Sequence, residues 1–596
     1  MAETYGFDKD SLLTIEVCCG DNVQSTFLPK GKNIWSLRIR RRRTAGAVLE
    51  DLGYFDVCAY TDFHDQAAAF VTARPMEVDV DTAFAMGQIK TWLKTCKNHT
   101  RCPNQDQIKL PTRLVDVSTA IPKLHITNGE QGHYVALSYC WGGPQRAALT
   151  QGNLSQYCQS VDTARLSQSI KDAIKVVRAV GLRYLWVDAL CIVQDSDADK
   201  IHEIAGMDKV YQDALFTISA ESASTAQEGF LSPRKRSLTS HQVPFRCPGG
   251  NFGSMYLYLM PSRLSLKEPL ETRAWTFQEK ILSSRLVMFN SETLKWSCST
   301  RQYHLGDSLC WLEEGYGGMF GATQRFQEML SPVNISHGLE LRNPWLDKWH
   351  SLVHQYSVRY HTDHKDRLIA LSGLARMLVS SRRCTYLAGL WRDDLLEQLG
   401  WRLLPSQWRP GPAYRAPSWS WASVDGEVDY IDFVTRMGEN PVRPVCTIIE
   451  CEVIPANKDA PFGTACDGWL VLDAPIRRGH YRLDDTKRND QRSEIVWDGN
   501  SPSHLPNLVS TRRASDPEIP VWYVCLDTNE ESMDDITEFA IISGLDHPTI
   551  QHIYGLVLKG LADGTYRRIG AFESVRSDQD VWNGLGYPET RRIKII

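Results

Sequence analysis

The chain has 596 residues, a formal net charge of −5, 42% hydrophobic residues and 23% charged residues. This length exceeds what one hydrophobic core supports, and the composition is that of an ordinary globular protein, so we expect about two to four domains. The small negative charge gives no reason to expect a nucleic-acid partner or an anionic membrane surface.

The N-terminus and the cysteine usage predict a cytoplasmic protein. The opening segment MAETYGFDKDSLLTIEVCCG has no apolar core of signal-peptide length. No window of about 18 uninterrupted apolar residues occurs, so we expect no membrane span. The 16 cysteines are scattered along the chain and are interpreted as reduced thiols.

Residues 1–110 are predicted to form an N-terminal mixed α+β region. They combine strand-like pieces (LLTIEVCC, DVCAY) with the amphipathic segment DTAFAMGQIKTWLKTC. The basic run RIRRRR at residues 38–43 is typical of a solvated strand or loop edge, and nuclear targeting or phosphate contact is the alternative.

A cysteine- and histidine-containing segment, CKNHTRC, follows the amphipathic segment. It places Cys96, His99 and Cys102 within seven residues, and these are residue types that bind zinc. A structural zinc site takes four ligands, and the nearest further candidates in the sequence are Cys58 and His64. The alternative needs no metal, because a spacing of three also places these side chains on one helix face.

The most regular part of the chain predicts an α/β core with a parallel sheet. The predicted elements are a strand at 133–143, a helix at 166–181, a strand at 182–193, a helix at 197–214 and a strand at 215–222. Ser167 is a candidate N-cap of the first helix and Gly181 follows its end. The two helices have apolar stripes formed by Ile170, Ala173, Ile174 and Val177, and by Ile201, Ile204, Met207 and Tyr211. Alternation of strands and helices favours right-handed crossovers and a three-layer arrangement.

The predicted secondary structure changes twice in the rest of the chain. The stretch SPRKRSLTSHQ (232–242) predicts a surface insertion, SMYLYLMP (254–261) a strand, and residues 270–283 a helix. Residues 320–405 are largely helical in pattern, and after residue 416 short alternating apolar runs predict a β-rich part. The predicted division is 1–110, 111–300 (the α/β core), 301–415 (mainly helical) and 416–596 (β-rich).

Three sequence blocks together resemble a known domain. YVALSYCWGG, LWVDALCIVQDSDADKIHEIAGMDKVYQDALFTISA and RAWTFQEKILSSRLVMF resemble, in order and spacing, the motif blocks of the heterokaryon-incompatibility (HET) domain of filamentous fungi. The downstream segments DRLIALSGLA, YLAGLW and APSWSWASVDG resemble the region that often accompanies it. The resemblance implies a fungal protein linked to self/non-self recognition and programmed cell death, a form of innate immunity.

The HET domain is in turn remotely similar to TIR domains, which have a flavodoxin-like α/β fold. This implies a parallel-sheet, three-layer (flavodoxin/TIR-like) core in this chain. Some TIR domains cleave NAD with a glutamate set four residues after a helix tryptophan. Trp275 and Glu279 stand in that relation here, so Glu279 is the candidate catalytic residue and NAD the candidate substrate.

The ends of the predicted strands supply candidate substrate-binding residues. Ligands of parallel α/β sheets bind outside the carboxyl ends of the strands. That rule selects Ser138, Tyr139 and Trp141 after the first strand, and Asp188 and Gln194 after the second.

The chemistry of NAD cleavage suggests a role for each of the following candidates. A carboxylate such as Glu279 stabilises the positive charge that develops on the sugar when the nicotinamide–ribose bond breaks. Tyr139, Trp141 and Trp275 are suited to stacking on the base, and Arg273 to pairing with pyrophosphate. There is no G-x-G-x-x-G or G-x-x-x-x-G-K-[ST] motif here, so a dinucleotide would not bind in the Rossmann manner.

Structural interpretations stay open beside the functional ones. Trp275 can be a core residue, and Glu279 can pair with Arg273 or Lys280. Asp188 can cap the turn after its strand, while Ser138 and Tyr139 can simply end theirs with hydrogen bonds. Cys191 lies in an apolar context typical of a buried, inert thiol.

Two functions therefore remain open at this point. One is a TIR-like NAD glycohydrolase. The other is a non-enzymatic signalling module that works by self-association or by binding a protein partner.

Overall fold

The computed structural model describes residues 11–19, 34–45, 48–71, 73–104, 108–234, 240–259, 267–307, 319–330, 344–403, 413–430, 443–483, 493–497, 521–527, 537–546, 551–576 and 589–596. The chain divides into two compact units. One comprises Met1–Thr272 and Glu279–Thr323, the other Arg273–Gln278 and Gln324–Ile596. The division into four parts stays a prediction. Within the described ranges, no helix is both long and apolar enough to cross a membrane.

The first unit contains an antiparallel sheet of order β1-β2-β3-β12-β11. Its strands are β1 (Ser11–Cys19), β2 (Ile34–Ala45), β3 (Val48–Tyr60), β11 (Ser240–Arg246) and β12 (Phe252–Leu259). The basic run at 38–43 lies in β2, which pairs with β1 on one side and β3 on the other. Part of the predicted insertion, residues 240–242, begins strand β11, and residues 235–239 lie outside the described residues.

A second, eight-stranded sheet of the same unit has the order β15-β14-β13-β10-β8-β9-β5-β6. Its strands are β5 (Arg113–Asp116), β6 (Lys123–Ile126), β8 (Val135–Ser138), β9 (Tyr184–Trp186), β10 (Phe216–Ser219), β13 (Arg285–Phe289), β14 (Leu294–Cys298) and β15 (Gln302–His304). The four neighbours β13, β10, β8 and β9 pair in parallel, and the flanking strands pair antiparallel. The carboxyl ends of the four parallel strands therefore meet at one edge. Strands β4 (Ile108–Lys109) and β7 (Gln131–Gly132) form a separate small ladder.

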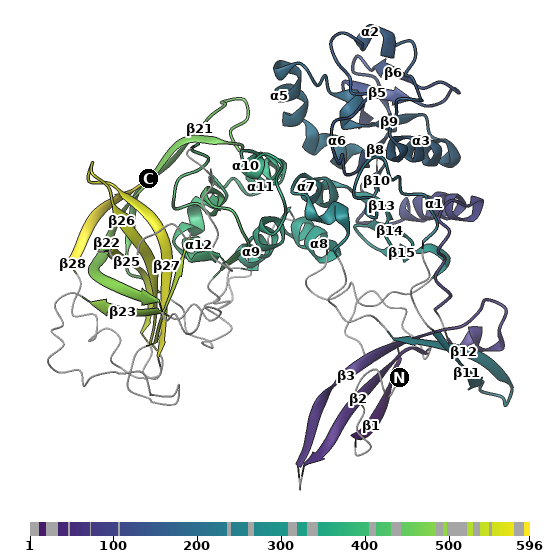
Figure 1. Ribbon diagram of the computed structural model, residues 1–596, viewed down its shortest axis with the longest axis horizontal. Helices are drawn as coiled ribbons and strands as arrows, with labels where there is room; N and C mark the ends of the chain where they lie inside the picture. The colour runs from purple at the N-terminus through teal and green to yellow at the C-terminus, as the bar shows by residue number, and fades with distance from the viewer. Residues whose placement is uncertain are drawn as a thin grey trace. The chain divides into compact units, whose positions relative to one another are not determined.

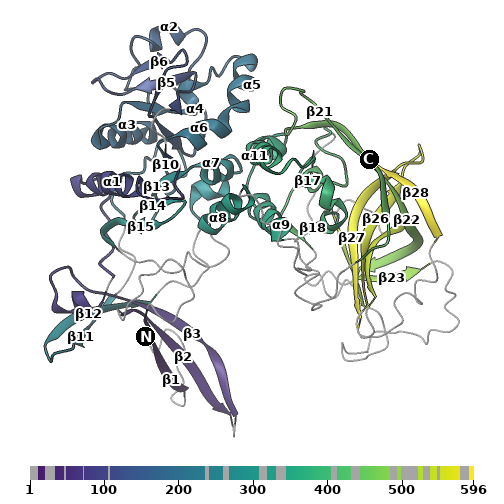
Figure 2. The same cartoon turned by 180° about the vertical axis from the view of Figure 1, so that it is seen from behind.

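Helices flank this sheet. They are α1 (Ala83–Cys96), α2 (Leu154–Tyr157), α3 (Gln168–Val180), α4 (Asp188–Cys191), α5 (Asp197–Ala205), α6 (Met207–Asp213) and α7 (Trp275–Leu282). In both views α1 and α3 lie on one side of the strands and α6 on the other (Figure 1, Figure 2). The described chain is thus a mixed α/β structure with many strands.

The helix predicted at 166–181 is confirmed as α3. All four residues of its apolar stripe are 5% exposed or less: Ile170, Ala173, Ile174 and Val177. Ser167 occupies the N-cap position, although its side chain makes no capping hydrogen bond. Gly181 ends the helix in the left-handed region, with a φ of 86° that glycine adopts without a steric penalty.

The strand predicted at 182–193 is only partly correct. Strand β9 ends at Trp186, and the chain then enters the helical turn α4. Asp188 Oδ1 accepts a hydrogen bond from Ala189 N at 2.6 Å, and Cys191 N donates to Val187 O at 2.8 Å. These local hydrogen bonds replace the pairing of a strand with its neighbours. An uninterrupted apolar run does not predict the change, because a buried strand and a buried helical turn are both apolar.

The single helix predicted at 197–214 is wrong at its centre, where Gly206 separates α5 from α6. Glycine is a poor helix former, and here it closes α5 through a bond from its N to Glu203 O at 3.0 Å. Ile201, expected in the buried stripe, is 52% exposed. Glu203 is buried instead and pairs with Arg113 at 3.2 Å.

The second unit begins with helices, as expected. They are α9 (Pro344–Ser357), α10 (Asp366–Ile369), α11 (Ser372–Arg382) and α12 (Leu395–Gln398), while α8 (Met319–Leu330) spans the boundary between the units. Four short strands accompany them: β16 (Tyr386–Leu387), β17 (Leu390–Trp391), β18 (Trp401–Leu403) and β19 (Val428–Tyr430). The expectation of helix is therefore wrong around Gly389, which turns the chain with a φ of 98°. A Cβ at Gly389 would lie 2.8 Å from the indole of Trp421, so the turn requires glycine.

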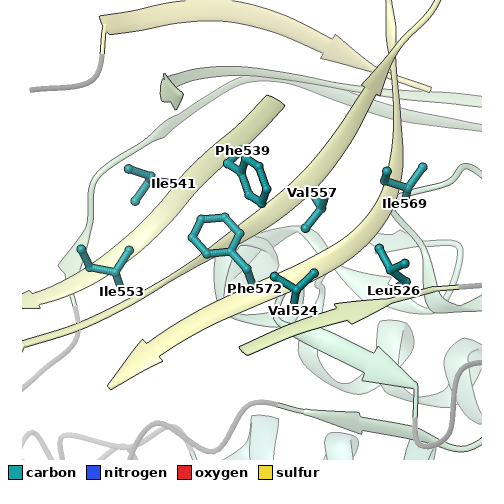
Figure 3. Close-up of a cluster of buried hydrophobic side chains, with 8 residues drawn as sticks. All are labelled: Val524, Leu526, Phe539, Ile541, Ile553, Val557, Ile569 and Phe572. Carbon is teal, nitrogen blue, oxygen red and sulfur yellow. The ribbon is translucent and has the colours of Figure 1, made fainter. Parts of the chain in front are cut away.

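The predicted β-rich C-terminal part is confirmed. Its strands are β20 (Arg443–Pro444), β21 (Thr447–Pro455), β22 (Ala465–Leu483), β23 (Ser493–Trp497), β24 (Val521–Leu526), β25 (Thr537–Asp546), β26 (Gln551–Gly560), β27 (Tyr566–Arg576) and β28 (Glu589–Ile595). Strands β25 to β28 pair in sequence order, and β22 pairs with both β25 and β28, which closes the sheet into a barrel. Figure 3 shows the side chains in its core: Val524, Leu526, Phe539, Ile541, Ile553, Val557, Ile569 and Phe572.

Replacing Phe572 by alanine should destabilise this core by about 3–5 kcal/mol, because the truncation leaves a cavity. Phe572 is 1% exposed and packs edge-on against Phe539 at 5.4 Å between ring centroids. Pulse proteolysis of the full chain in a urea series, with cleavage sites assigned by mass spectrometry, measures the loss. The control Phe252→Ala removes a ring that is 65% exposed and should change stability by no more than about 0.5 kcal/mol. Equal shifts for the two variants would contradict the assigned core.

Candidate active site at the carboxyl edge of the parallel strands

Polar side chains gather where the parallel strands end. Ser138 is the last residue of β8 and is paired in register with Ser219, the last residue of β10. Both are 1% exposed or less. Asp188 follows the neighbouring strand β9 after one residue. Since these strands are adjacent in the sheet, the candidate residues predicted from strand ends lie along one edge.

Helix α7 brings Glu279 to this edge. The Ser138 hydroxyl donates a hydrogen bond to Glu279 Oε2, and the Glu279 side chain is buried, with a residue exposure of 7%. One turn later, Ser283 Oγ bonds Glu279 O at 2.6 Å and Thr217 Oγ1 of β10 at 2.7 Å. Two of the predicted site residues, Ser138 and Glu279, are therefore in direct contact.

Tyr211 of α6 is a further residue at this site. Burial raises its pKa well above the ordinary value, and the Glu279 and Asp188 carboxylates raise the pKa further because they oppose a phenolate. The phenol therefore stays protonated, and it donates to Leu137 O at 3.3 Å. The sequence pattern identified Tyr211 only as a member of an apolar stripe. Tyr139, a predicted base-stacking residue, also contributes to the raised pKa of Tyr211 and is 3% exposed.

Trp141, Asp188 and Gln194 form a second connected group. The indole Nε1 of Trp141 donates to Asp188 Oδ2 at 2.8 Å, and Gln194 Nε2 donates to Asp188 O at 3.2 Å. Gly142, the residue after Trp141, has a φ of 66°. A Cβ atom at Gly142 would lie 2.4 Å from the Cβ atom of Thr225. This close approach requires glycine directly after Trp141 and fixes the path of the loop that carries the indole.

Arg273 and Trp275 belong to the second unit, whereas Glu279 belongs to the first. Trp275 Nε1 donates to Asp366 Oδ2 at 2.9 Å, and burial raises the pKa of Asp366 although this hydrogen bond opposes the shift. The Arg273 carbonyl accepts from Arg359 Nη1 at 3.3 Å. Base stacking by Trp275 and pyrophosphate binding by Arg273 stay predictions.

Comparison with known families agrees with the sequence motifs. Residues 134–279 match the family model described as heterokaryon incompatibility protein (HET). The chain carries a HET domain. No curated protein and no solved structure matches the chain. The matched range of the HET domain contains every predicted substrate-binding residue and ends at Glu279.

A buried ion cluster lies next to Glu279. Lys280 is 2% exposed, and its Nζ lies 2.5 Å from Glu221 Oε1 and 2.9 Å from Glu271 Oε1. Burial raises the pKa of Glu221 to about 7, although Lys280 opposes the shift. Burial works against the charge of Lys280, but the two carboxylates outweigh it and raise the lysine pKa. Sequence reasoning missed Glu221, although it lies two residues past the end of β10 and the strand-end rule would have included it.

The predicted metal ligands Cys96, His99 and Cys102 also come together. The fourth member of their group is Cys298, at the end of β14. Of the two further candidates from the sequence, His64 is not part of the group, and the side chain of Cys58 lies outside the described residues. The ligand atoms of the four residues all lie within 4.8 Å of one another.

Cys191 is a structural residue of the HET domain, in agreement with its apolar sequence context. It is 1% exposed, and burial raises its pKa to about 12. A thiol with this pKa stays protonated near neutral pH and is a weak nucleophile.

Replacing Lys280 by methionine should lower the stability of the HET domain by about 3–5 kcal/mol above neutral pH, because two carboxylates lose their buried partner. Without Lys280 the folded-state pKa of Glu221 rises further above the unfolded value. A raised carboxyl pKa contributes stability as pH falls through it, so the deficit should shrink on acidification. Urea titrations followed by hydrogen exchange of the β8 and β10 peptides measure both effects.

Two variants control this experiment. Lys280→Met with Glu221→Gln removes the pH-dependent part of the deficit. Lys175→Met breaks a more exposed pair with Asp81 and should change stability by at most about 1 kcal/mol. A deficit that is the same at all pH values would contradict the role of Glu221.

Proposed function

We propose that this chain acts in fungal self/non-self recognition and programmed cell death, and that its HET domain does so as a TIR-like enzyme that cleaves NAD. The HET match over residues 134–279 supports the family role. The four adjacent parallel strands, with helices on both sides, support a three-layer, flavodoxin/TIR-like core. A cytoplasmic site of action belongs to the same proposal.

One observation carries the enzymatic proposal: Glu279 is a buried carboxylate at the carboxyl edge of the parallel strands, bonded by Ser138 at the end of β8. Ligand sites of parallel α/β sheets lie at this edge. A carboxylate with little contact to water interacts more strongly with a developing positive charge than an exposed one does. The place and the environment of Glu279 both suit the reaction.

In the proposed reaction the bond between the ribose carbon and the nicotinamide nitrogen breaks. Its electron pair leaves with nicotinamide, whose ring nitrogen loses its positive charge, and water adds to the ribose carbon with release of a proton. Glu279 stabilises the positive charge that builds on the sugar. Tyr139 and Trp141 bind the planar base by stacking, and Asp188 with Gln194 holds Trp141 in place.

The second candidate function is a signalling module that self-associates or binds a protein partner without turnover. Two observations favour it. The Glu279 carboxylate accepts a hydrogen bond from Ser138, and the Trp275 indole donates one to Asp366. Each contact gives the residue a structural partner within the protein, so both residues can be explained by packing alone.

A measurement of nicotinamide release from NAD by the full chain distinguishes the enzymatic proposal from the signalling proposal. The full chain is required because helix α7 contributes residues to both compact units. We expect Glu279→Gln to lower the rate by on the order of 10²–10³-fold, since it removes the charge and keeps the shape. The matched control Glu292→Gln, which alters a carboxylate paired with Lys295 at 3.3 Å on the loop before β14, should keep the rate.

Absence of nicotinamide release from the parent chain, including at concentrations where it self-associates, would overturn the enzymatic proposal. In that case cell death on expression should persist in the Glu279→Gln variant. Persistence of both turnover and cell death in that variant would instead remove Glu279 from the mechanism.

A further inference from the structure

Cys96, His99, Cys102 and Cys298 form a four-membered cluster outside the matched HET range. Cys96 is the last residue of α1, and the chain beyond it makes two successive turns. In the first, His99 N donates a hydrogen bond to Cys96 O at 3.1 Å, and in the second, Cys102 N donates to His99 O at 3.3 Å. These turns place three side chains on one side of the segment. Cys298 approaches from the end of β14, which contacts α1.

We propose that these four residues bind one structural Zn²⁺ ion. The set offers three sulfur ligands and one imidazole nitrogen, a combination typical of closed zinc sites. All four positions of a tetrahedron are supplied by the protein, so no position remains for water or substrate. The site therefore holds the fold together and takes no part in catalysis, and the inference stands independently of NAD cleavage.

The separations of the His99 nitrogen from two of the sulfur atoms fit this geometry. Zn–S bonds of about 2.3 Å and Zn–N bonds of about 2.0–2.1 Å in a tetrahedron place sulfur and nitrogen about 3.6 Å apart. His99 Nδ1 lies 3.5 Å from Cys298 Sγ and 3.7 Å from Cys102 Sγ. A single ring nitrogen makes one well-directed hydrogen bond, whereas a shared metal explains two sulfurs at nearly the same distance.

The surroundings of the cluster suit a metal bound by thiolates. Cys96 and Cys298 are 0% and 4% exposed. Three thiolates and Zn²⁺ carry a net charge of −1, and the buried Arg285 guanidinium donates to Cys96 Sγ at 3.2 Å. Arg285 also donates to Pro103 O at 2.7 Å, next to Cys102. A charged donor in this position orients the ligand and offsets the negative charge of the site.

The zinc ion would connect two segments that are far apart in sequence. The segment that ends α1 is joined to β14, a strand of the eight-stranded sheet. Packing supports the same contact, because Trp92 of α1 lies 6.2 Å from Trp296 of β14 between ring centroids. Loss of the metal should therefore weaken the attachment of α1 to β14 rather than unfold the whole chain.

The test is the zinc content of the tag-free full-length chain, purified under reducing conditions without added metal. We expect about one Zn²⁺ per chain, and a decrease of at least about tenfold in Cys298→Ser. Cys247→Ser, which alters a buried cysteine outside the cluster, should keep the metal. Replacement of zinc by Co²⁺ should give thiolate charge-transfer bands and the intense visible bands of a tetrahedral site.

A second pair of variants covers the case in which Cys298→Ser does not fold. His99→Cys preserves four ligands and should retain the metal with a stronger thiolate band, whereas His99→Ala should lose it. A parent chain that contains no zinc and takes up no Co²⁺ after reduction would overturn the proposal. Full metal retention by both Cys298→Ser and His99→Ala would overturn it as well, and the cluster would then be a packed group of thiols and imidazole.

Discussion

Helix α7 is held at the carboxyl edge of the four parallel strands by buried polar contacts from two consecutive residues. Glu279 accepts from Ser138 at the end of β8, and Lys280 pairs with Glu221 just past the end of β10. Charges removed from water are tolerated only when they are paired or hydrogen-bonded. The rotation of α7 about its axis and its position along the sheet are thereby constrained together. The location of the candidate site follows from the order of the strands that supply these partners.

Local patterns predicted the parts of this arrangement that depend on local physics. The spacing of apolar residues identifies α3 with its glycine end, and the strand-end rule selects Ser138 and Asp188. The break at Gly206 was missed, and the predicted strand was continued past Trp186 although a turn capped by Asp188 was one of the open interpretations. A few hydrogen bonds, such as that from Trp141 to Asp188, determine where these elements end. The periodicity of apolar residues does not predict such hydrogen bonds.

Contact partners that are distant in the sequence could not be predicted, for a different reason. Cys298 completes the cluster begun by Cys96, but more than 200 positions separate them and only the pairing of β14 in the sheet brings them together. Trp275 was expected to act beside Glu279 because of their spacing on one helix. Its indole N–H bonds Asp366, 91 positions away, a partner that the spacing does not indicate. Spacing restricts which residues share a helix face, but it does not determine which of the available groups each one contacts.

The anchoring of α7 bears on whether Glu279 has a role beyond packing. Lys280 with its two carboxylates and Ser283 with Thr217 already tie the helix to β10 and its extension. A further buried carboxylate is therefore not needed to hold the helix in place, and burying it has a cost in free energy that hydroxyl donors offset only in part. An apolar residue of similar volume would pack at the same position at lower cost. The retention of a carboxylate here, against Ser138 and a protonated Tyr211 at the edge where parallel sheets bind their ligands, is what favours a chemical role for Glu279.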